Sequence, residues 1–156
     1  MPELNLPVVD LKLREEDGML KVFDPLRGRY VALTPEEYVR QHFAAWLCSE
    51  FHCPPSLTSN EIGIEVNGTR RRCDTVVFDR KGAPLIIVEY KQPNVVITQT
   101  VFDQIARYNM ALHARYLIVS NGLTHYCCKM DYAAHTYHFI PRIPDFNEIT
   151  NPFSEN

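Results

Sequence analysis

Two short apolar runs separated by a turn constrain the fold of this chain more than any other part of the sequence. Residues 75–78 and 85–88 are β-branched, aliphatic or aromatic, and such side chains favour β-strands. Pro84 directly precedes the second run. Residues 79–84 combine Asp, Gly and Pro with charged side chains, which is typical of a hairpin connection. The second run is apolar on both faces, as expected for a central strand covered on two sides. The sequence therefore predicts two adjacent antiparallel strands.

Charged residues stand at the ends of these two strands. Asp74 precedes the first run, and Glu89 and Lys91 follow the second. Because side chains alternate along a strand, Glu89 and Lys91 project from the same face. Two carboxylates that meet there can hold a hard cation such as Mg²⁺, and a neighbouring lysine can orient water or neutralise charge on a phosphate. The alternative is that all three are ordinary solvated charges at strand ends.

A first helix is predicted to begin at Thr34. This residue is a favourable N-cap, Pro35 suits the first helical position, and Glu37 stands three residues after the cap, as in a capping box. Apolar residues then recur at helical spacing, namely Val39, Phe43, Trp46, Leu47 and Phe51. The prolines at 54–55 end the helix. We expect an amphipathic helix that packs against the sheet.

A second helix is predicted after the second strand, beginning near Thr98 or Thr100. Its expected buried face comprises Val101, Ile105, Tyr108 and Leu112. Gln104 and Tyr108 stand four residues apart and hence on neighbouring turns of the same side. Since a buried strand follows at residues 116–119, the helix is a crossover connection, which predicts a mixed sheet flanked by helices.

Three consecutive arginines, Arg70, Arg71 and Arg72, precede Asp74. They could form a local patch that contacts phosphate groups. A local patch would be needed for DNA binding, because the net charge of −3 argues against a wholly cationic surface. Alternatively, the arginines protect an exposed strand edge from pairing with other chains. The two roles are compatible.

Together these motifs resemble a known family. Asp74, a β-hairpin and Glu89-x-Lys91 look like the PD-(D/E)xK nuclease superfamily, although Cys73 stands where that motif has proline. The segments LTPEEYVRQHF, RRRCDTVVFD, PLIIVEYKQP and DQIARYN resemble, more narrowly, the N-terminal nuclease domain of type I restriction enzyme R subunits. The similarity covers residues 33–122. The helicase that follows the nuclease domain in those R subunits has no counterpart in the 156 residues.

The resemblance implies an α/β (α+β) fold with a restriction-endonuclease-like core. This core is a mixed β-sheet flanked by helices in the order αβββαβ, here with an N-terminal β-hairpin. The implied activity is that of an endodeoxyribonuclease that uses Mg²⁺ or Mn²⁺. The implied partners are DNA and either restriction-modification subunits or a separate helicase.

The resemblance also implies roles for individual residues. The metal ligands would be Asp74, Glu89 and Glu37, with Glu36 as the alternative to Glu37. Lys91 would position the attacking water, and Gln104 of a Gln-x-x-x-Tyr motif would help to orient Lys91 or the phosphate. Tyr108 of the same motif joins the three arginines as a candidate DNA contact. Because capping alone explains both helix glutamates, their metal role stays open.

Composition and length favour a single globular domain. The 156 residues are 46% hydrophobic, enough for a sizeable core. We expect a lead-in hairpin over residues 1–33 that covers a sheet edge, a core over 34–140 with further strands at 124–130 and 136–140, and a tail with little structure over 141–156. No stretch has the length of a membrane span and the N-terminus lacks a signal-peptide pattern, so a cytoplasmic location is expected.

The cysteines favour reduced thiols rather than disulfides. They are odd in number and never spaced as CxxC, at Cys48, Cys53, Cys73, Cys127 and Cys128. A zinc site from Cys48, His52 and Cys53 would lack a second ligand pair.

Two hypotheses for the function follow. The first is a metal-dependent DNA endonuclease domain. The second is a catalytically silent nuclease-fold module that binds DNA or a partner protein, suggested by the modest basic character and by the lack of a motor segment in the sequence. Metal binding discriminates between the two.

Overall fold

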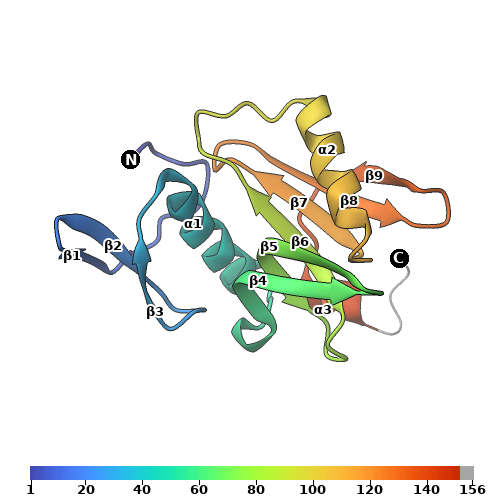
Figure 1. Cartoon of the computed structure of the whole chain (residues 1–156), viewed down its shortest axis with the longest axis horizontal. Helices are drawn as coiled ribbons and strands as arrows, with labels where there is room; N and C mark the ends of the chain where they lie inside the picture. The colour runs from blue at the N-terminus through green and yellow to red at the C-terminus, as the bar shows by residue number, and fades with distance from the viewer. Residues whose placement is uncertain (152–156) are drawn as a thin grey trace.

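The computed structural model describes residues 1–151, and its centre is a mixed six-stranded β-sheet (Figure 1). In their order across the sheet the strands are β4 (Thr58–Val66), β5 (Thr69–Phe78), β6 (Pro84–Tyr90), β7 (Tyr116–Ser120), β8 (His125–Asp131) and β9 (Thr136–Ile140). Neighbouring strands are antiparallel except β6 and β7, which run parallel. Helix α2 (Gln99–Met110) makes the crossover that the parallel pair requires. The predicted mixed sheet in the order αβββαβ is confirmed.

Turn chemistry holds the predicted hairpins in register. In the turn between β5 and β6, Asp79 Oδ1 accepts hydrogen bonds of 2.9 Å from the backbone N–H groups of Lys81 and Ala83. Strands β4 and β5 are joined through Asn67 and Gly68, whose φ angles of 51° and 81° are left-handed, as a type I′ turn requires. The strand pair that carries the candidate site therefore follows from local sequence.

Helices α1 (Pro35–Glu50) and α2 cover opposite faces of the sheet. The side chains of β6 alternate between two cores: Ile86 and Val88 pack on the α1 side, and Ile87 packs on the α2 side. None of the three is more than 1% exposed. The prediction of a central strand covered on two sides is confirmed.

Helix α1 begins where the sequence predicts. Thr34 is the N-cap, and its Oγ1 accepts a hydrogen bond of 3.1 Å from the backbone N–H of Glu37. Val39, Phe43 and Leu47 are fully buried against the sheet. After α1, a short 3₁₀ helix, η1 (Pro55–Leu57), leads into β4.

The N-terminal lead-in forms its own three-stranded antiparallel sheet beside α1 (Figure 1). Its strands are β1 (Leu13–Glu16), β2 (Met19–Asp24) and β3 (Arg29–Ala32). This N-terminal sheet reaches edge strand β4 through side chains, since Asn60 Nδ2 donates a hydrogen bond of 3.0 Å to Asp24 Oδ2. The expected hairpin is present, extended by a third strand.

Helix α2 buries a different face from the predicted one. Its buried residues are Phe102, Ala106 and Asn109, whereas Tyr108 is 50% exposed. Phe102 packs against Phe139 of β9, with ring centroids 4.8 Å apart. This contact comes from a strand much later in the chain, so helical periodicity alone could not reveal it. The prediction that Tyr108 lies in the buried face was wrong.

The segment after β9 is more ordered than expected. Helix α3 (Phe146–Thr150) begins at its N-cap Asp145, and the Phe146 side chain is fully buried in the core on the α1 side. The expectation of little structure was therefore wrong for residues 141–151. The rest of the predicted tail, residues 152–156, lies outside the described part of the chain.

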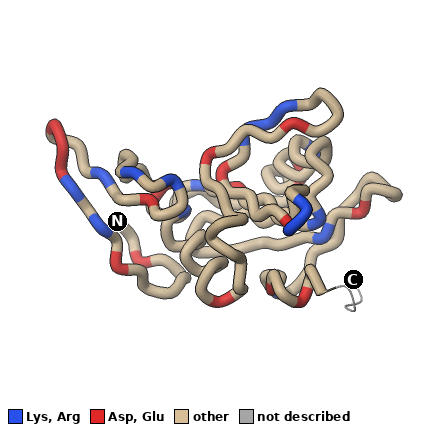
Figure 2. Tube along the Cα trace, turned by 90° about the horizontal axis from the view of Figure 1, so that it is seen from below, with Lys and Arg blue, Asp and Glu red and all other residues tan. Residues whose placement is uncertain are grey.

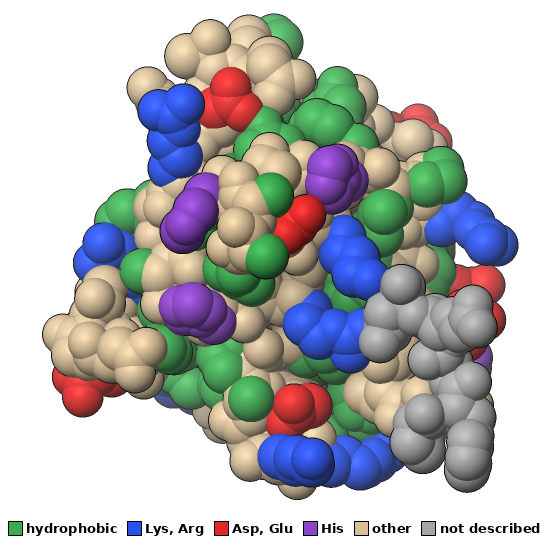
Figure 3. All heavy atoms as spheres, turned by 90° about the vertical axis from the view of Figure 1, so that its right-hand side faces the viewer, with side chains coloured by type: hydrophobic (Ala, Val, Ile, Leu, Met, Phe, Trp, Pro, Cys, Tyr) green, Lys and Arg blue, Asp and Glu red, His purple; other side chains and the backbone are tan. Residues whose placement is uncertain are grey.

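Charges of both signs are interspersed over the molecule. Figure 2 shows Lys and Arg positions next to Asp and Glu positions along the trace. The side away from the N-terminal sheet carries histidine, basic and hydrophobic side chains together (Figure 3). A DNA contact would therefore depend on a local patch. Within residues 1–151, no helix is both long and apolar enough to cross a membrane.

Candidate functional site

Asp74 and Glu89 face each other across β5 and β6. The strand register pairs Thr75 with Val88, so the next step of the ladder places Asp74 opposite Glu89. Asp74 Oδ2 accepts a hydrogen bond of 2.9 Å from the backbone N–H of Tyr90. Glu89 Oε1 is enclosed and has no hydrogen-bond partner among residues 1–151. The fold thus brings the two strand acids together.

Burial and the charge of Asp74 both affect the protonation of Glu89. Burial raises the pKa of Glu89 to about 9, and the negative charge of Asp74 and a hydrogen bond to its carboxylate add to the effect. Lys91 and Arg40 act in the opposite direction without outweighing it. Glu89 is therefore protonated at neutral pH in the metal-free protein. A divalent cation could take the place of this proton, because it would neutralise both carboxylates.

Of the two adjacent glutamates on α1, Glu37 is engaged away from this acid pair. It is 5% exposed, and its Oε2 accepts hydrogen bonds from Arg27 at 2.6 Å and Gln41 at 2.9 Å. Its Oε1 lies 3.3 Å from Arg40 Nε. The carboxylate that we predicted as a metal ligand is thus enclosed by two arginines.

Glu36 has different surroundings. Its pKa is raised by burial first and by the charge of Asp74 second, while Arg40 and Lys91 oppose the rise. A carboxyl group whose pKa is shifted by the charges of Asp74 and Lys91 lies near the acid pair. The helix acid in electrostatic contact with the site is therefore Glu36.

Lys91 directly follows β6 and is held by the end of β7. Its backbone N–H donates a hydrogen bond of 2.9 Å to the carbonyl oxygen of Ser120. The charge of its ammonium group opposes the rise in the pKa of both Glu89 and Glu36. The structure therefore gathers Asp74, Glu89, Lys91 and Glu36 at one end of the β5–β6 pair.

Helix α2 closes the other side of Glu89. A depression of about 210 Å³ is lined by Arg72, Glu89, Gln104, Ile105, Tyr108 and Asn109. Gln104 and Tyr108 thus lie beside Glu89, and both are exposed. The amide of Gln104 and the phenol of Tyr108 at this rim are therefore available to a ligand rather than packed in the core.

Asn109 is the residue of this depression that the sequence analysis missed. It is 3% exposed, and its Nδ2 donates a hydrogen bond of 2.9 Å to the carbonyl oxygen of Ile105. This bond sets the amide orientation and leaves Oδ1 buried without a partner in the described chain. A buried acceptor without a donor is unusual and can mark a binding role. A correct assignment of the buried face of α2 would have revealed it.

The predicted DNA-contact arginines lie at the rim. The Arg71 guanidinium stacks 4.4 Å from the ring centroid of Tyr108, and Arg72 pairs with Glu61 at 3.2 Å. Arg70 is exposed on the β4–β5 hairpin. Arg71 and Arg72 are therefore adjacent to the candidate site, whereas Arg70 extends the basic run away along the hairpin.

The donor set suits a hard divalent cation, although residues 1–151 contain no preformed cluster of three or more His, Cys, Asp or Glu side chains around a metal position. Asp74 and Glu89 provide facing carboxyl groups, and the unpartnered Glu89 Oε1 is an oxygen available to an ion. The zinc site considered at the cysteines receives no such support. There, His52 Nδ1 instead contacts Asp145 Oδ2 at 2.6 Å.

A larger cavity of about 700 Å³ lies elsewhere in the fold. Its lining includes Trp46 of α1, His125 of β8 and Ile149 of α3. None of the predicted site residues lines it. We therefore place the candidate site at the acid pair and at the smaller depression, which Glu89 lines.

The family model for the type I restriction enzyme R protein N terminus matches residues 35–144. This segment contains both strand acids, Lys91, α1 and α2. No curated protein matches the chain.

A solved structure is similar in fold. It is a fragment of an HsdR subunit of a type I restriction enzyme from Vibrio vulnificus YJ016, with a TM-score of 0.51 and 21% sequence identity. The similarity covers 74% of this chain and 24% of that chain. The matched part of the present chain thus spans about a quarter of the length of that fragment.

Proposed function

Because the chain belongs to the family of type I restriction enzyme R protein N termini, we propose that it is a metal-dependent DNA endonuclease domain that hydrolyses phosphodiester bonds. The observation that carries this proposal is the facing pair of Asp74 and Glu89, with an enclosed oxygen that has no partner in the described chain. Such a pair is unfavourable for folding, and a role in cation binding accounts for it.

The residues that would hold Mg²⁺ or Mn²⁺ are Asp74, Glu89 and Glu36. All three provide hard oxygen ligands. When bound, the ion would supply Lewis acidity and neutralise charge on the phosphate. Glu36 takes the place of Glu37 in this proposal because Arg27 and Arg40 engage the Glu37 carboxylate.

The other site residues act on water and DNA. The Lys91 ammonium would orient the attacking water by donating a hydrogen bond to its oxygen and would stabilise negative charge on the phosphate. Gln104, exposed beside Glu89, would position Lys91 or the scissile phosphate. Tyr108 and the arginines at 70–72 would contact the DNA backbone, which supplies affinity without sequence readout.

The test is nicking of a supercoiled plasmid by the purified protein with Mg²⁺ or Mn²⁺. We expect nicking that a chelator abolishes, that Lys91→Ala removes and that Lys81→Ala preserves. Lys81 is a matched control, because it lies exposed in the β5–β6 turn and carries the same charge. Nicking that survives undiminished in Lys91→Ala would contradict the proposal, because the wild-type signal would then come from a contaminating nuclease.

The second candidate is a catalytically silent nuclease-fold module that binds DNA or a restriction-modification partner. It is favoured by the raised pKa of Glu89, which leaves the acid pair with a proton at neutral pH, and by the lack of a preformed ligand cluster in residues 1–151. Calorimetry with Mn²⁺ separates the two. DNA binding without any detectable Mn²⁺ binding supports the silent module.

A further inference from the structure

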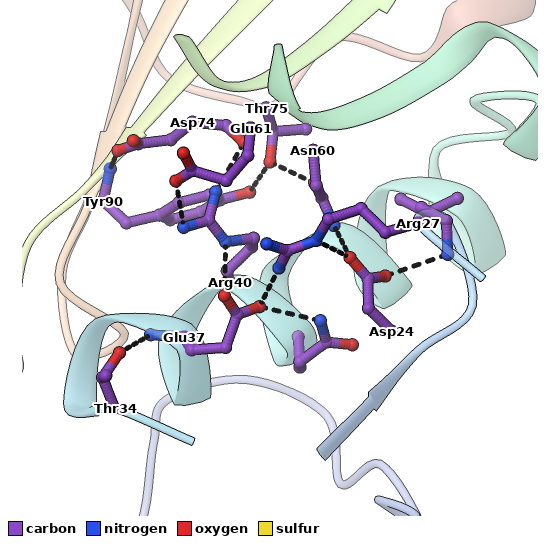
Figure 4. A network of polar contacts seen from close by, with 12 residues as sticks. Asp24, Arg27, Thr34, Glu37, Arg40, Asn60, Glu61, Asp74, Thr75 and Tyr90 are labelled. Atoms are coloured by element: carbon purple, nitrogen blue, oxygen red, sulfur yellow. Dashed lines mark hydrogen bonds and ion pairs between the residues drawn. The ribbon is translucent and has the colours of Figure 1, made fainter. Parts of the chain in front are cut away.

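A closed ring of polar contacts joins the N-terminal sheet to the candidate site (Figure 4). The ring begins and ends at Asp74. Its members, in order, are Asp74, Arg40, Glu37, Arg27, Asp24, Asn60, Thr75 and Tyr90. They come from the β2–β3 region, α1, β4, β5 and β6, which are far apart in the sequence. Two separate routes therefore connect Asp24 and Arg27 with Asp74.

Arg40 is the ring member from α1 that contacts Asp74 directly. Its Nη1 donates a hydrogen bond of 2.6 Å to the backbone carbonyl oxygen of Asp74, and its Nη2 donates one of 2.7 Å to Glu61 Oε1. Its Nε lies 3.3 Å from Glu37 Oε1, close enough for an ion pair although not aligned as a hydrogen bond. Arg40 is only 5% exposed. A rigid guanidinium thus links α1, β4 and β5 at once.

Glu37 connects Arg40 with the N-terminal sheet, because its carboxylate contacts both Arg27 and Arg40. Arg27 Nη2 donates a hydrogen bond of 2.6 Å to Glu37 Oε2, and Arg27 Nε pairs with Asp24. Burial alone would raise the pKa of Asp24, but hydrogen bonds from Arg27, Asn60 and a backbone N–H outweigh it and lower this pKa. Asp24 is therefore charged at neutral pH and anchors Arg27.

The second route runs through neutral side chains. Asn60 donates to Asp24 at 3.0 Å, and Thr75 Oγ1 donates to Asn60 Oδ1 at 2.7 Å. The hydroxyl of Tyr90 donates to Thr75 Oγ1 at 2.9 Å, and the backbone N–H of Tyr90 holds Asp74. This route therefore reaches the residue that adjoins Glu89.

We propose that Arg40 is a positioning residue for the candidate metal site, and that Asp24 and Arg27 of the N-terminal sheet hold Arg40 in place. In its metal-dependent consequences this inference rests on the proposed function. Residues 13–32 are then part of the functional unit, although the family match begins only at residue 35. The physical basis is that partners of metal ligands orient them, and their loss commonly lowers metal affinity or activity about 10–100-fold.

The first test compares Mn²⁺ affinity by calorimetry in charge-matched variants. Arg40→Lys keeps the charge, but one ammonium cannot reach Asp74, Glu61 and Glu37 in the same fork geometry. We expect its Mn²⁺ affinity to fall about 10-fold or more, and kcat for nicking to fall with KM for DNA little changed.

The second comparison uses the N-terminal sheet itself. Arg27→Gln should weaken Mn²⁺ binding, whereas Arg29→Gln should not. Arg29 is an exposed residue of β3 and loses the same charge. If Arg27→Gln does not fold, Arg27→Lys takes its place, since it keeps the charge but not the two-pronged contact with Asp24 and Glu37.

Hydrogen exchange in the metal-free protein tests the role of Arg40 independently of metal binding. In the metal-free protein, hydrogen exchange of the Tyr90 amide should become about 10-fold faster in Arg40→Lys and Arg27→Gln, while exchange of the Ile118 amide in central strand β7 stays unchanged. Unchanged Tyr90 exchange and unchanged Mn²⁺ affinity in a folded Arg40→Lys protein would overturn the positioning role. A wild-type protein that binds no Mn²⁺ would overturn the proposed function, and Tyr90 exchange would then decide the positioning role alone.

Discussion

The backbone nitrogen of Tyr90 lies 2.9 Å from Asp74 Oδ2, so the residue directly after Glu89 holds the carboxylate that faces Glu89. The strand pair itself thus sets the distance between the two acids before any cation binds. In the metal-free state burial, and secondly the charge of Asp74, raise the pKa of Glu89 to about 9.

Replacing Glu89 by glutamine should remove a pH dependence of stability. The folded-state pKa of about 9 lies above the ordinary value of 4.5, so the contribution of this proton is fully present below about pH 4.5 and is lost as the pH rises to about 9. The unfolding free energy of the wild type should fall across this window, and Glu89→Gln should become the more stable protein by on the order of 2 kcal/mol near pH 8. Urea denaturation at several pH values measures this, with the exposed Glu50→Gln as control. Equal pH slopes in Glu89→Gln and wild type would contradict it.

Asp74→Asn should leave the metal-free protein as stable as wild type or raise its Tm by a few degrees. The asparagine Oδ1 can still accept a hydrogen bond from the Tyr90 N–H, while the negative charge that helps to raise the pKa of Glu89 disappears. Mn²⁺ should stabilise only the wild type, by about 2.7 kcal/mol at about 100 times the Kd. Thermal scans with and without Mn²⁺ test this, with Asp17→Asn in the β1–β2 turn as control. A clearly destabilised Asp74→Asn with the same response to Mn²⁺ as wild type would remove the metal site.

Glu36→Gln and Glu37→Gln should affect different properties: the first Mn²⁺ affinity, the second stability. Glu36→Gln should weaken Mn²⁺ binding about 10-fold with little change in stability, because the charge of Asp74 acts on the Glu36 carboxyl group. Glu37→Gln should lower the unfolding free energy by about 3 kcal/mol, because it leaves the partly buried Arg27 and the buried Arg40 without their shared carboxylate. Calorimetry and urea denaturation of both variants decide this. A Glu36→Gln protein with wild-type Mn²⁺ affinity would exclude Glu36 from the site.

Asn109→Leu, in the depression beside Glu89, should reduce plasmid nicking without lowering stability. Because Asn109 Oδ1 has no partner in the described chain, an apolar side chain of similar size should leave stability unchanged or higher. If the amide oxygen takes part in binding, plasmid nicking should fall about 10-fold. Nicking at the wild-type rate would show that Asn109 is only a packing residue. Gln104→Ala, on the exposed side of the same helix, serves as the comparison for stability.

Local sequence was sufficient for the elements that carry the site. The apolar runs and the turn between them predicted β5 and β6, and Thr34 and Pro35 predicted the start of α1. Each of these features depends on residues close together in the chain: a hydroxyl that caps an N–H three residues on, or a Gly with a left-handed backbone in a turn. The alternation of side chains along a strand also predicted that Glu89 and Lys91 share a face.

Only the tertiary structure decided which side chains meet. From the sequence we favoured Glu37 over Glu36 as the metal ligand, although both suit the first turn of a helix. The structure distinguishes them because Arg27 reaches Glu37 from another sheet. Periodicity misassigned the buried face of α2, because the deciding partner, Phe139, lies on a later strand. By itself, then, the sequence determined the strands, turns, caps and the family, which depend on short-range geometry. The choice of helix acid and the ring around Asp74 depend on contacts between distant segments, which exist only once the chain has folded.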